Sequence, residues 1–152
     1  MSHSVNYDTL AAQAEGLLSG QSHRVANAAN LSALLFQELP GVNWVGFYFT
    51  ENGGLVLGPF QGKPACVNIP WGQGVCGTAA ATRETQRVAD VHAFEGHITC
   101  DTASRSELVV PLLVDGEVVG VLDIDSPEPG RFSAEDEAGL VRVADVYLSS
   151  IS

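Results

Sequence analysis

Ser106-Glu-Leu-Val-Val-Pro-Leu-Leu-Val-Asp-Gly-Glu-Val-Val-Gly-Val-Leu-Asp-Ile-Asp125 is the stretch that decides the fold. Both halves are rich in valine, leucine and isoleucine, as strands are, and Asp115-Gly116 in the middle is typical of a tight hairpin turn. The sequence therefore predicts strands over Ser106–Val114 and Glu117–Asp125, joined as an antiparallel pair.

A second hairpin is predicted upstream. The aromatic stretch Asn43–Thr50 and the returning stretch Leu55–Phe60 flank the turn signal Asn52-Gly53-Gly54. Shorter strands are expected over Cys66–Ile69 and Gln86–Val91, with a short helix over Gly74–Arg83 between them. Together with the first hairpin, these segments give six strands.

Helices flank the strands at both ends of the chain. Apolar residues at helical spacing predict one helix over residues 7–18 and another that Ser22 caps and Pro40 stops. Ser133 and Asp136 resemble a capping box that opens a C-terminal helix. The order ααβββαβββα, with successive hairpins, predicts an α+β fold: a mostly antiparallel sheet with helices packed on one face.

Length and charge limit the classes of function. A chain of 152 residues fits one domain, and a formal net charge of -11 argues against nucleic acid or an anionic membrane as a partner. We see no signal peptide and no apolar run near the ~18 residues of a membrane helix. A cytoplasmic location is therefore expected. Three cysteines are then expected to be buried, metal-bound or reactive, because structural disulfides are rare there.

The polar stretch Glu95–Glu107 holds Cys100, with His97 three residues before it. Binding and catalytic groups often lie on such loops, and a protonated histidine near a cysteine favours its thiolate. Cys100 is therefore a candidate nucleophile. The alternative from this stretch alone is a surface loop with an incidental thiol.

Three carboxylates lie on the predicted hairpin. Asp123 and Asp125 are two residues apart on a strand and so point to one face. They form a buried site, or else they lie in solvent and cap the Ser126-Pro127 turn. A two-residue turn pairs position 108 with 123 and turns Glu107 away from them. A bulge or a longer turn would bring Glu107 to their side, because one residue of slip exchanges the faces.

Two other patterns are weaker. Gly72-Gln-Gly74-Val-Cys-Gly77 matches a dinucleotide fingerprint, but that fingerprint needs a parallel βαβ unit, so we interpret the glycines as a tight turn into a helix. The three cysteines with His92 and His97 are conceivable zinc ligands. No cysteine pair has the Cys-x-x-Cys spacing, so neither a metal nor another cofactor is expected.

Several motifs together resemble one known family, the free methionine-(R)-sulfoxide reductases, which use a GAF fold. They cover nearly the whole chain and are Trp44-Val-Gly-Phe-Tyr48, Leu57-Gly-Pro-Phe-Gln-Gly-Lys-Pro-Ala-Cys66, Gly72-Gln-Gly-Val-Cys-Gly77, Asp90-Val-His92, His97-Ile-Thr-Cys-Asp101, Ser104–Glu107 and Gly120-Val-Leu-Asp-Ile-Asp-Ser-Pro127. The resemblance implies a single GAF domain over residues 1–152, with the active site under loops on the sheet face that the helices leave open.

The resemblance also implies a substrate and a mechanism. Free L-methionine-(R)-sulfoxide is reduced to methionine when Cys100 attacks its sulfur and becomes a sulfenic acid. Cys66, or alternatively Cys76, then forms a disulfide with Cys100 that thioredoxin reduces. The matching substrate-site residues are Trp44, Glu107, Asp123 and Asp125. A positioned acid among these carboxylates, Asp125 in this assignment, would protonate the leaving oxygen. A homodimer is also implied, with the N-terminal helices as the contact.

Two other interpretations stay open from the sequence. One is a GAF module that senses a small molecule without turnover. The other is a zinc- or redox-linked regulatory protein. The sequence leaves undecided whether Cys66 or Cys76 is the main resolving cysteine, and which carboxylate gives the proton.

Overall fold

The computed structural model describes residues 3–96 and 103–152. Its helices and strands follow one another in the predicted order, with one short 3-10 turn in addition. The elements are α1 (Tyr7–Leu18), α2 (Arg24–Glu38), β1 (Trp44–Glu51), β2 (Gly54–Gly62), β3 (Asn68–Pro70), α3 (Gly74–Thr82), β4 (Gln86–Val88), η1 (Val91–Ala93), β5 (Ser106–Val114), β6 (Glu117–Ser126) and α4 (Ala134–Ile151).

The strands form one six-stranded sheet with the order β3-β2-β1-β6-β5-β4. Each neighbouring pair in this order is antiparallel. The two predicted hairpins, β1–β2 and β5–β6, therefore lie side by side and meet along β1 and β6 in the middle of the sheet. This confirms the predicted α+β fold and places the strand that carries Asp123 and Asp125 at its centre.

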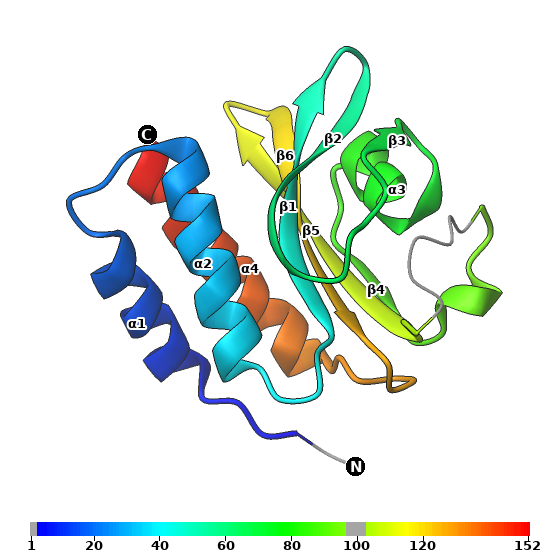
Figure 1. The fold of residues 1–152 in the computed structure, drawn as a ribbon, viewed down its shortest axis with the longest axis horizontal. Coiled ribbons are helices and arrows are strands. Elements are labelled where there is room, and N and C mark those ends of the chain that lie inside the picture. Colours follow the sequence, from blue (N-terminus) through cyan, green and yellow to red (C-terminus); the bar gives the residue numbers. More distant parts are fainter. Residues whose placement is uncertain (1–2, 97–102) are drawn as a thin grey trace.

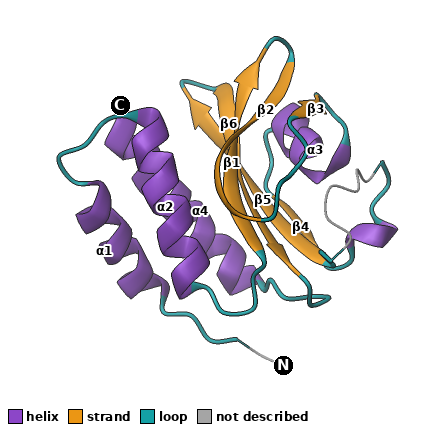
Figure 2. Ribbon diagram, viewed as in Figure 1, coloured by secondary structure: helices purple, strands orange, loops and turns teal. Residues whose placement is uncertain are grey.

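The two faces of the sheet are covered differently (Figures 1 and 2). Helices α2 and α4 lie against one face, and α1 packs on the outer side of both. Together they enclose a helix-side core that includes Leu35, Phe47, Leu108, Leu122 and Tyr147. On the other face, α3 encloses a site-side core that includes Trp44, Tyr48, Cys76, Val109 and Val121. The predicted layer of helices on one face is confirmed, and α3 shares the opposite face with the loops.

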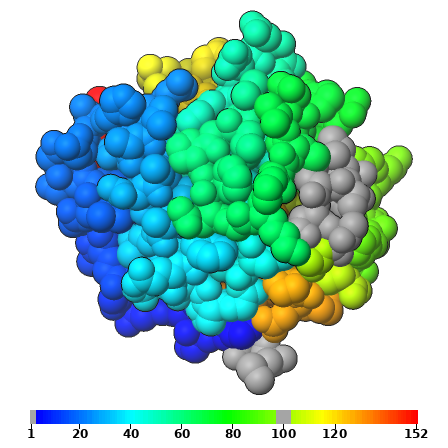
Figure 3. Space-filling view, in the orientation of Figure 1, coloured from blue at the N-terminus to red at the C-terminus, as the bar shows by residue number. Residues whose placement is uncertain are grey.

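In the space-filling view, the green segment that follows β2 and runs toward α3 forms the surface over the front of the sheet (Figure 3). Pro64 and Ala65 of this segment line the same cavity as Trp44. Trp44, at the start of β1, is accordingly only 2% exposed.

Capping residues explain where the helices begin. The Asn6 side chain accepts the Thr9 amide at 3.1 Å and opens α1. Helix α2 begins one residue later than a Ser22 cap requires: the His23 Nδ1 accepts the amides of Val25 and Ala26, both at 3.2 Å. The Ser22 prediction is therefore wrong, because the imidazole takes over the capping role. The capping box of Ser133 and Asp136 at α4 is confirmed.

Two short strands differ from their predicted bounds. Strand β3 begins at Asn68, so Cys66 lies in the loop before it. Strand β4 ends at Val88 instead of Val91, because the chain turns into η1. The Asp90 carboxylate accepts the His92 amide at 3.0 Å and starts that turn.

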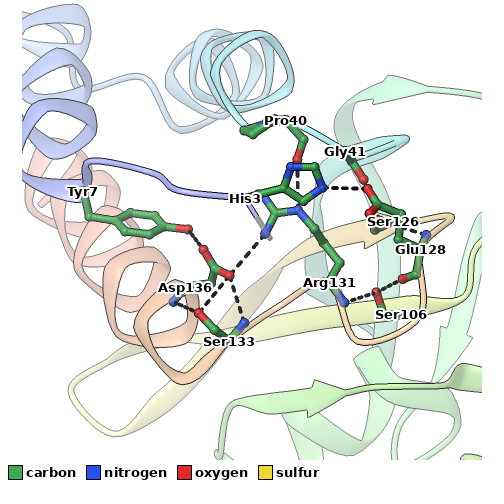
Figure 4. A network of polar contacts seen from close by, with 10 residues as sticks. All are labelled: His3, Tyr7, Pro40, Gly41, Ser106, Ser126, Glu128, Arg131, Ser133 and Asp136. Carbon is green, nitrogen blue, oxygen red and sulfur yellow. Dashed lines mark hydrogen bonds and ion pairs between the residues drawn. The ribbon is translucent and has the colours of Figure 1, made fainter. Parts of the chain in front are cut away.

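A polar network holds the loop between β6 and α4 in place (Figure 4). Arg131 donates from Nη1 to Asp136 Oδ2 at 3.1 Å, and the Tyr7 hydroxyl donates to Asp136 Oδ1 at 2.6 Å. Nearer the N-terminus, His3 contacts Glu128 at 2.8 Å. These contacts fix the chain that leaves β6, and so they support the strand end where Asp125 lies.

Within residues 3–96 and 103–152, none of the helices combines the length and the hydrophobicity that a membrane-spanning segment requires.

Candidate active site

A one-residue bulge in β6 decides which way Glu107 points. Beyond the two-residue turn, Leu113 pairs with Val118, but the next partner of Leu112 is Gly120, so Val119 is extra. Val118 packs in the site-side core and Val119 against the helix-side core. Past the bulge, Glu107 pairs with Asp125 instead of facing away from it. The bulged alternative is therefore confirmed, and the simple pairing of 108 with 123 is wrong.

This register brings all three carboxylates to one cavity of about 50 Å³ on the site-side face. Asp123 is 4% exposed, while Glu107 and Asp125 are partly buried. The alternative in which both aspartates lie in solvent is thus wrong. The lining residues are Trp44, Tyr48, Pro64, Ala65, Ile69, Gln73, Gly74, Val75, Cys76, Ser104, Glu107, Asp123 and Asp125.

Cys76 reaches the carboxylates from α3. It is 4% exposed, and its Sγ donates to Glu107 Oε2 at 3.8 Å. The glycines before it make a turn: Gly72 and Gly74 have φ of 82° and 66°, and the Gly74 amide donates to the Gly96 carbonyl at 3.0 Å. Such φ values favour glycine. The neighbouring strands are antiparallel, so the glycines form a turn into a helix and not a dinucleotide-binding unit, as predicted.

Burial among like charges perturbs these acids. Burial, together with the neighbouring Asp123 charge, raises the pKa of Glu107, and burial with the Asp125 charge raises the pKa of Asp123. The pKa of the Cys76 thiol is also raised, first by burial and then by Asp123 and Glu107. The cluster therefore favours its protonated forms, which supplies proton donors inside the cavity.

Aromatic rings form the apolar wall beside the acids. Trp44 stacks on Tyr48 with ring centroids 5.9 Å apart and on Phe60 at 5.2 Å. Its Nε1 donates to the Lys63 carbonyl at 3.0 Å, so the indole satisfies its polar atom away from the carboxylates. Trp44 is at once a core residue and a wall of the cavity.

Tyr48 also lines the cavity, and the sequence analysis did not single it out. Burial and the nearby Asp123 raise its pKa, so its hydroxyl keeps its proton. The available signal was strand periodicity: Tyr48 lies four residues after Trp44 on a strand and therefore points to the same face.

The cysteines differ in position and state. Cys66 is partly buried in the loop between β2 and β3 and is disulfide-bonded. Cys76 is a free thiol and is the cavity-lining cysteine among the described residues. Cys100 and His97, the predicted nucleophile and its neighbour, lie outside the described residues. The cavity therefore brings together five predicted site residues: Trp44, Cys76, Glu107, Asp123 and Asp125.

Metal-ligating atoms also meet in this cavity. One atom each of Cys76, Glu107 and Asp123 lies within 4.8 Å of the other two, and all three groups are buried or partly buried. His92, an exposed residue of η1, does not belong to this group within the described parts of the chain. The cysteines lack Cys-x-x-Cys spacing, so their positions in the sequence do not indicate this set.

Comparisons with known proteins identify the family of the chain. A family model for the GAF domain matches residues 23–147. Protein YtsP of Bacillus subtilis is 56% identical over 149 residues, covering 97% of this chain and 91% of that protein. The free methionine-R-sulfoxide reductase of Escherichia coli is 58% identical over 124 residues, covering 82% of this chain and 75% of that enzyme.

Solved structures show the same similarity. The free methionine-R-sulfoxide reductase (fRMsr) of Staphylococcus aureus in its reduced form superposes with a TM-score of 0.97 at 48% identity. The match covers 100% of this chain and 99% of that one. Its complex with substrate superposes with a TM-score of 0.95 at 47% identity, with the same coverage. The resemblance inferred from the motifs is confirmed: the chain belongs to the GAF-domain family and, within it, to the free methionine-R-sulfoxide reductases.

Proposed function

We propose that this protein reduces free L-methionine-(R)-sulfoxide to L-methionine. The observation that carries the proposal is the convergence of Glu107, Asp123 and Asp125 beside the Trp44 indole in one small buried cavity. Free methionine sulfoxide offers an ammonium group to the acids and an apolar S-methyl group to the aromatic wall. A cavity that encloses the whole amino acid excludes a methionine sulfoxide that is part of a protein.

The acids have two tasks in this proposal. An ionised carboxylate holds the substrate ammonium, and a protonated one donates to the sulfoxide oxygen, which is a poor leaving group until it is protonated. The raised pKa values of Glu107 and Asp123 supply protonated carboxyls near neutral pH. We assign the donation to Asp125, which pairs with both Glu107 and Trp44 across the sheet and would receive its proton from the neighbouring protonated carboxyl groups of Glu107 or Asp123. Trp44 packs on the S-methyl group.

Cys100 carries the redox step. Its thiolate attacks the sulfoxide sulfur, the oxygen passes to the cysteine, and methionine leaves while Cys100 becomes a sulfenic acid. A second cysteine thiol then displaces water from the sulfenic acid and forms a disulfide. Thioredoxin dithiol reduces that disulfide to two thiols and is itself oxidised.

Cys66 is the resolving cysteine in this scheme. It is disulfide-bonded while Cys76 is a free thiol, which supports Cys66 as the ordinary partner. Cys76 lies buried among acids that keep it protonated, so we assign it an auxiliary role.

Epimer-resolved turnover tests the function. Purified protein is incubated with free L-methionine-(R)-sulfoxide or its (S) epimer, with thioredoxin recycling, and methionine is quantified. We expect turnover of the (R) epimer alone, abolished in Cys100→Ser, strongly reduced in Cys66→Ser with thioredoxin, and least affected in Cys76→Ser. Binding of the sulfoxide without turnover by folded, reduced protein would instead support a ligand sensor.

The proposal includes the protein's surroundings. We infer a single GAF domain over residues 1–152, a cytoplasmic location where thioredoxin keeps thiols reduced, and a homodimer. For the dimer, the N-terminal helices carry exposed apolar side chains: Leu17, Val25 and Phe36 are 41%, 43% and 37% exposed. Light scattering coupled to size-exclusion chromatography tests the dimer. A mass equal to one chain at micromolar protein concentration would contradict it.

A further inference from the structure

We propose that the reduced protein binds one thiophilic divalent cation, with Zn²⁺ as the reference ion, through Cys76, Glu107 and Asp123. The bound cation would occupy the cavity in place of the amino-acid substrate. Binding of the cation stands independently of the proposed reductase activity, whereas the resulting inhibition rests on that activity.

The first support is the spacing of the ligand atoms. One atom each of Cys76, Glu107 and Asp123 lies within 4.8 Å of the other two, and Cys76 Sγ is 3.8 Å from Glu107 Oε2. Zinc bonds of about 2.3 Å to sulfur and 2.0 Å to oxygen at a tetrahedral angle require a sulfur–oxygen separation of about 3.5 Å. A shift of a few tenths of an ångström therefore closes this edge around an ion.

The second support is an unsatisfied acceptor in the same cavity. Asp123 is 4% exposed, and its Oδ1 has no hydrogen-bond partner within residues 3–96 and 103–152. A buried carboxylate oxygen in that condition costs free energy until a donor or a cation reaches it. The oxygen belongs to a residue that lines the cavity, where an ion would meet it.

The third support is the charge around the ligands. The described residues that line the cavity include three carboxylates and a thiol but no lysine, arginine or histidine. A dication therefore supplies positive charge that these cavity walls lack. When it binds, the Cys76 thiol releases its proton to solvent, as does any carboxyl group that was protonated, so the ligands coordinate as anions.

The ligand types select among cations. A thiolate favours zinc, cobalt and similar borderline ions over magnesium and calcium, which prefer oxygen. Three protein ligands leave a fourth position open to water, as in catalytic zinc sites. The same two carboxylates are the groups we assign to the substrate, so the cation and the amino acid compete.

Cobalt spectroscopy tests the site directly. Reduced protein, kept in a phosphine instead of a thiol reductant, is titrated with Co²⁺, and the thiolate-to-cobalt charge-transfer band is recorded. We expect a saturable band at one ion per chain that Zn²⁺ bleaches and Mg²⁺ does not. The band should disappear in Cys76→Ser and persist in Cys66→Ser and Cys100→Ser.

Carboxylate variants complete the test. Asp123→Asn and Glu107→Gln should each weaken Co²⁺ binding about tenfold or more, since loss of even an outer-shell partner has effects of that size. Asp115→Asn, at the exposed β5–β6 turn, is the matched control and should leave the affinity unchanged. Circular dichroism identifies any variant that fails to fold, and the remaining carboxylate variant then decides the result.

Several results would overturn the inference: no saturable band, a band that survives in Cys76→Ser, or a band lost in Cys100→Ser but kept in Cys76→Ser. Inhibition is read separately. We expect Zn²⁺ to raise the apparent KM for the sulfoxide without lowering kcat. A Cys76-dependent band in protein without turnover supports the cation site and removes only the reductase proposal. Turnover without a band removes only the cation site.

Discussion

Glu107 on β5 pairs directly with Asp125 on β6, and both side chains lie on the site-side face because Val119 bulges between them and the turn. Without that extra residue, Glu107 and the two aspartates would lie on opposite faces of the sheet. A local irregularity far from the cavity therefore sets the composition of the cavity.

Removing one buried carboxylate should stabilise the protein at alkaline pH. Burial and neighbouring charges raise the folded-state pKa of Asp123 and Glu107 above the usual 3.8 and 4.5. Between those values and the raised pKa the folded state binds more protons than the unfolded state, so the free energy of unfolding falls as pH rises. Asp123→Asn removes the contribution of Asp123 to this fall in the free energy of unfolding.

Urea denaturation of reduced protein from pH 5 to pH 8.5 measures the effect. Asp123→Asn should gain stability relative to the parent as pH rises, by about 1 kcal/mol or more at the upper end. Asp115→Asn in the exposed turn is the control and should show no such trend. A parent protein that becomes more stable than Asp123→Asn with rising pH would contradict the prediction.

Asp136 should show the opposite dependence on pH. Burial alone would raise its pKa, but hydrogen bonds from Ser133 and Tyr7 and the charge of Arg131 outweigh burial and lower it below 3.8. A lowered pKa contributes stability that is lost as pH falls through the folded-state value. Asp136→Asn should cost about 3–5 kcal/mol near pH 7, because it leaves Arg131 buried without its charge partner.

Thermal unfolding at pH 7 and pH 3 measures the difference in stability between Asp136→Asn and the parent. This difference should be smaller at pH 3. Asp8→Asn is the matched control. Asp8 forms an exposed ion pair with Arg142, and exposed pairs contribute no more than about 1 kcal/mol. Equal losses of stability in Asp136→Asn and Asp8→Asn would show that the network of Figure 4 does not hold the β6–α4 loop as described.

Trp44 should report substrate binding. The chain has two tryptophans, and Trp71 is 39% exposed while Trp44 is 2% exposed and lines the cavity. In a Trp71→Phe variant, the remaining indole fluorescence should change saturably with free methionine sulfoxide, while kcat/KM stays close to that of the parent. Trp44→Phe should lose the bond to Lys63 and raise KM. An unchanged KM in Trp44→Phe would exclude Trp44 from binding.

Gly46→Ala should disturb the same wall from below. A Cβ at position 46 would overlap the Phe60 side chain and come within 2.5 Å of the Trp44 ring. Overpacking of this kind costs about 1–3 kcal/mol, and it should also weaken sulfoxide binding by displacing the indole. Chemical denaturation and steady-state kinetics measure the two effects.

Gly16→Ala is the control for that substitution. Position 16 lies in α1, and a Cβ there meets nothing within 4 Å. Replacing glycine by alanine in an exposed helix stabilises by about 0.5–1 kcal/mol. If the free energy of unfolding rises in Gly16→Ala and falls in Gly46→Ala, packing and not backbone entropy decides the outcome at Gly46.

Cys76 should react slowly with alkylating agents. Burial, followed by the charges of Asp123 and Glu107, raises the pKa of its thiol and suppresses the thiolate. In reduced protein, peptide mass spectrometry should find Cys66 modified by iodoacetamide well before Cys76. Asp123→Asn should accelerate the alkylation of Cys76. Alkylation of Cys76 first would indicate an activated thiol and would reopen its assignment as auxiliary.

Regular patterns made most of the fold predictable. The hairpin signals Asp115-Gly116 and Asn52-Gly53-Gly54 and the capping box at Ser133 each describe a local structure that their own residues stabilise. His23 shows the limit of such reasoning: both Ser22 and His23 can offer an acceptor to helix amides, and only the path of the chain decides which one does so.

The site was less predictable because it depends on register. Alternation alone places Asp123 and Asp125 together, but the position of Glu107 depends on a bulge that leaves no mark in the Val118-Val119 pair. Pro111 in β5 is compatible with a bulge or an edge, but it does not indicate where a bulge occurs. The approach of Cys76 to Glu107 joins a helix to a strand 31 residues away, a tertiary contact that sequence spacing does not encode.

The two faces of β1 and β6 separate two demands on the protein. Phe47, Leu122 and Ile124 pack among the helices, while Trp44, Asp123 and Asp125 face the cavity on alternate positions of the same strands. Side chains on the cavity face can therefore be exchanged in a designed library without removing any member of the helix-side layer. The scaffold is accordingly suited to being retargeted to other small zwitterions, provided that insertions and deletions within these two strands are avoided, since each would exchange the faces.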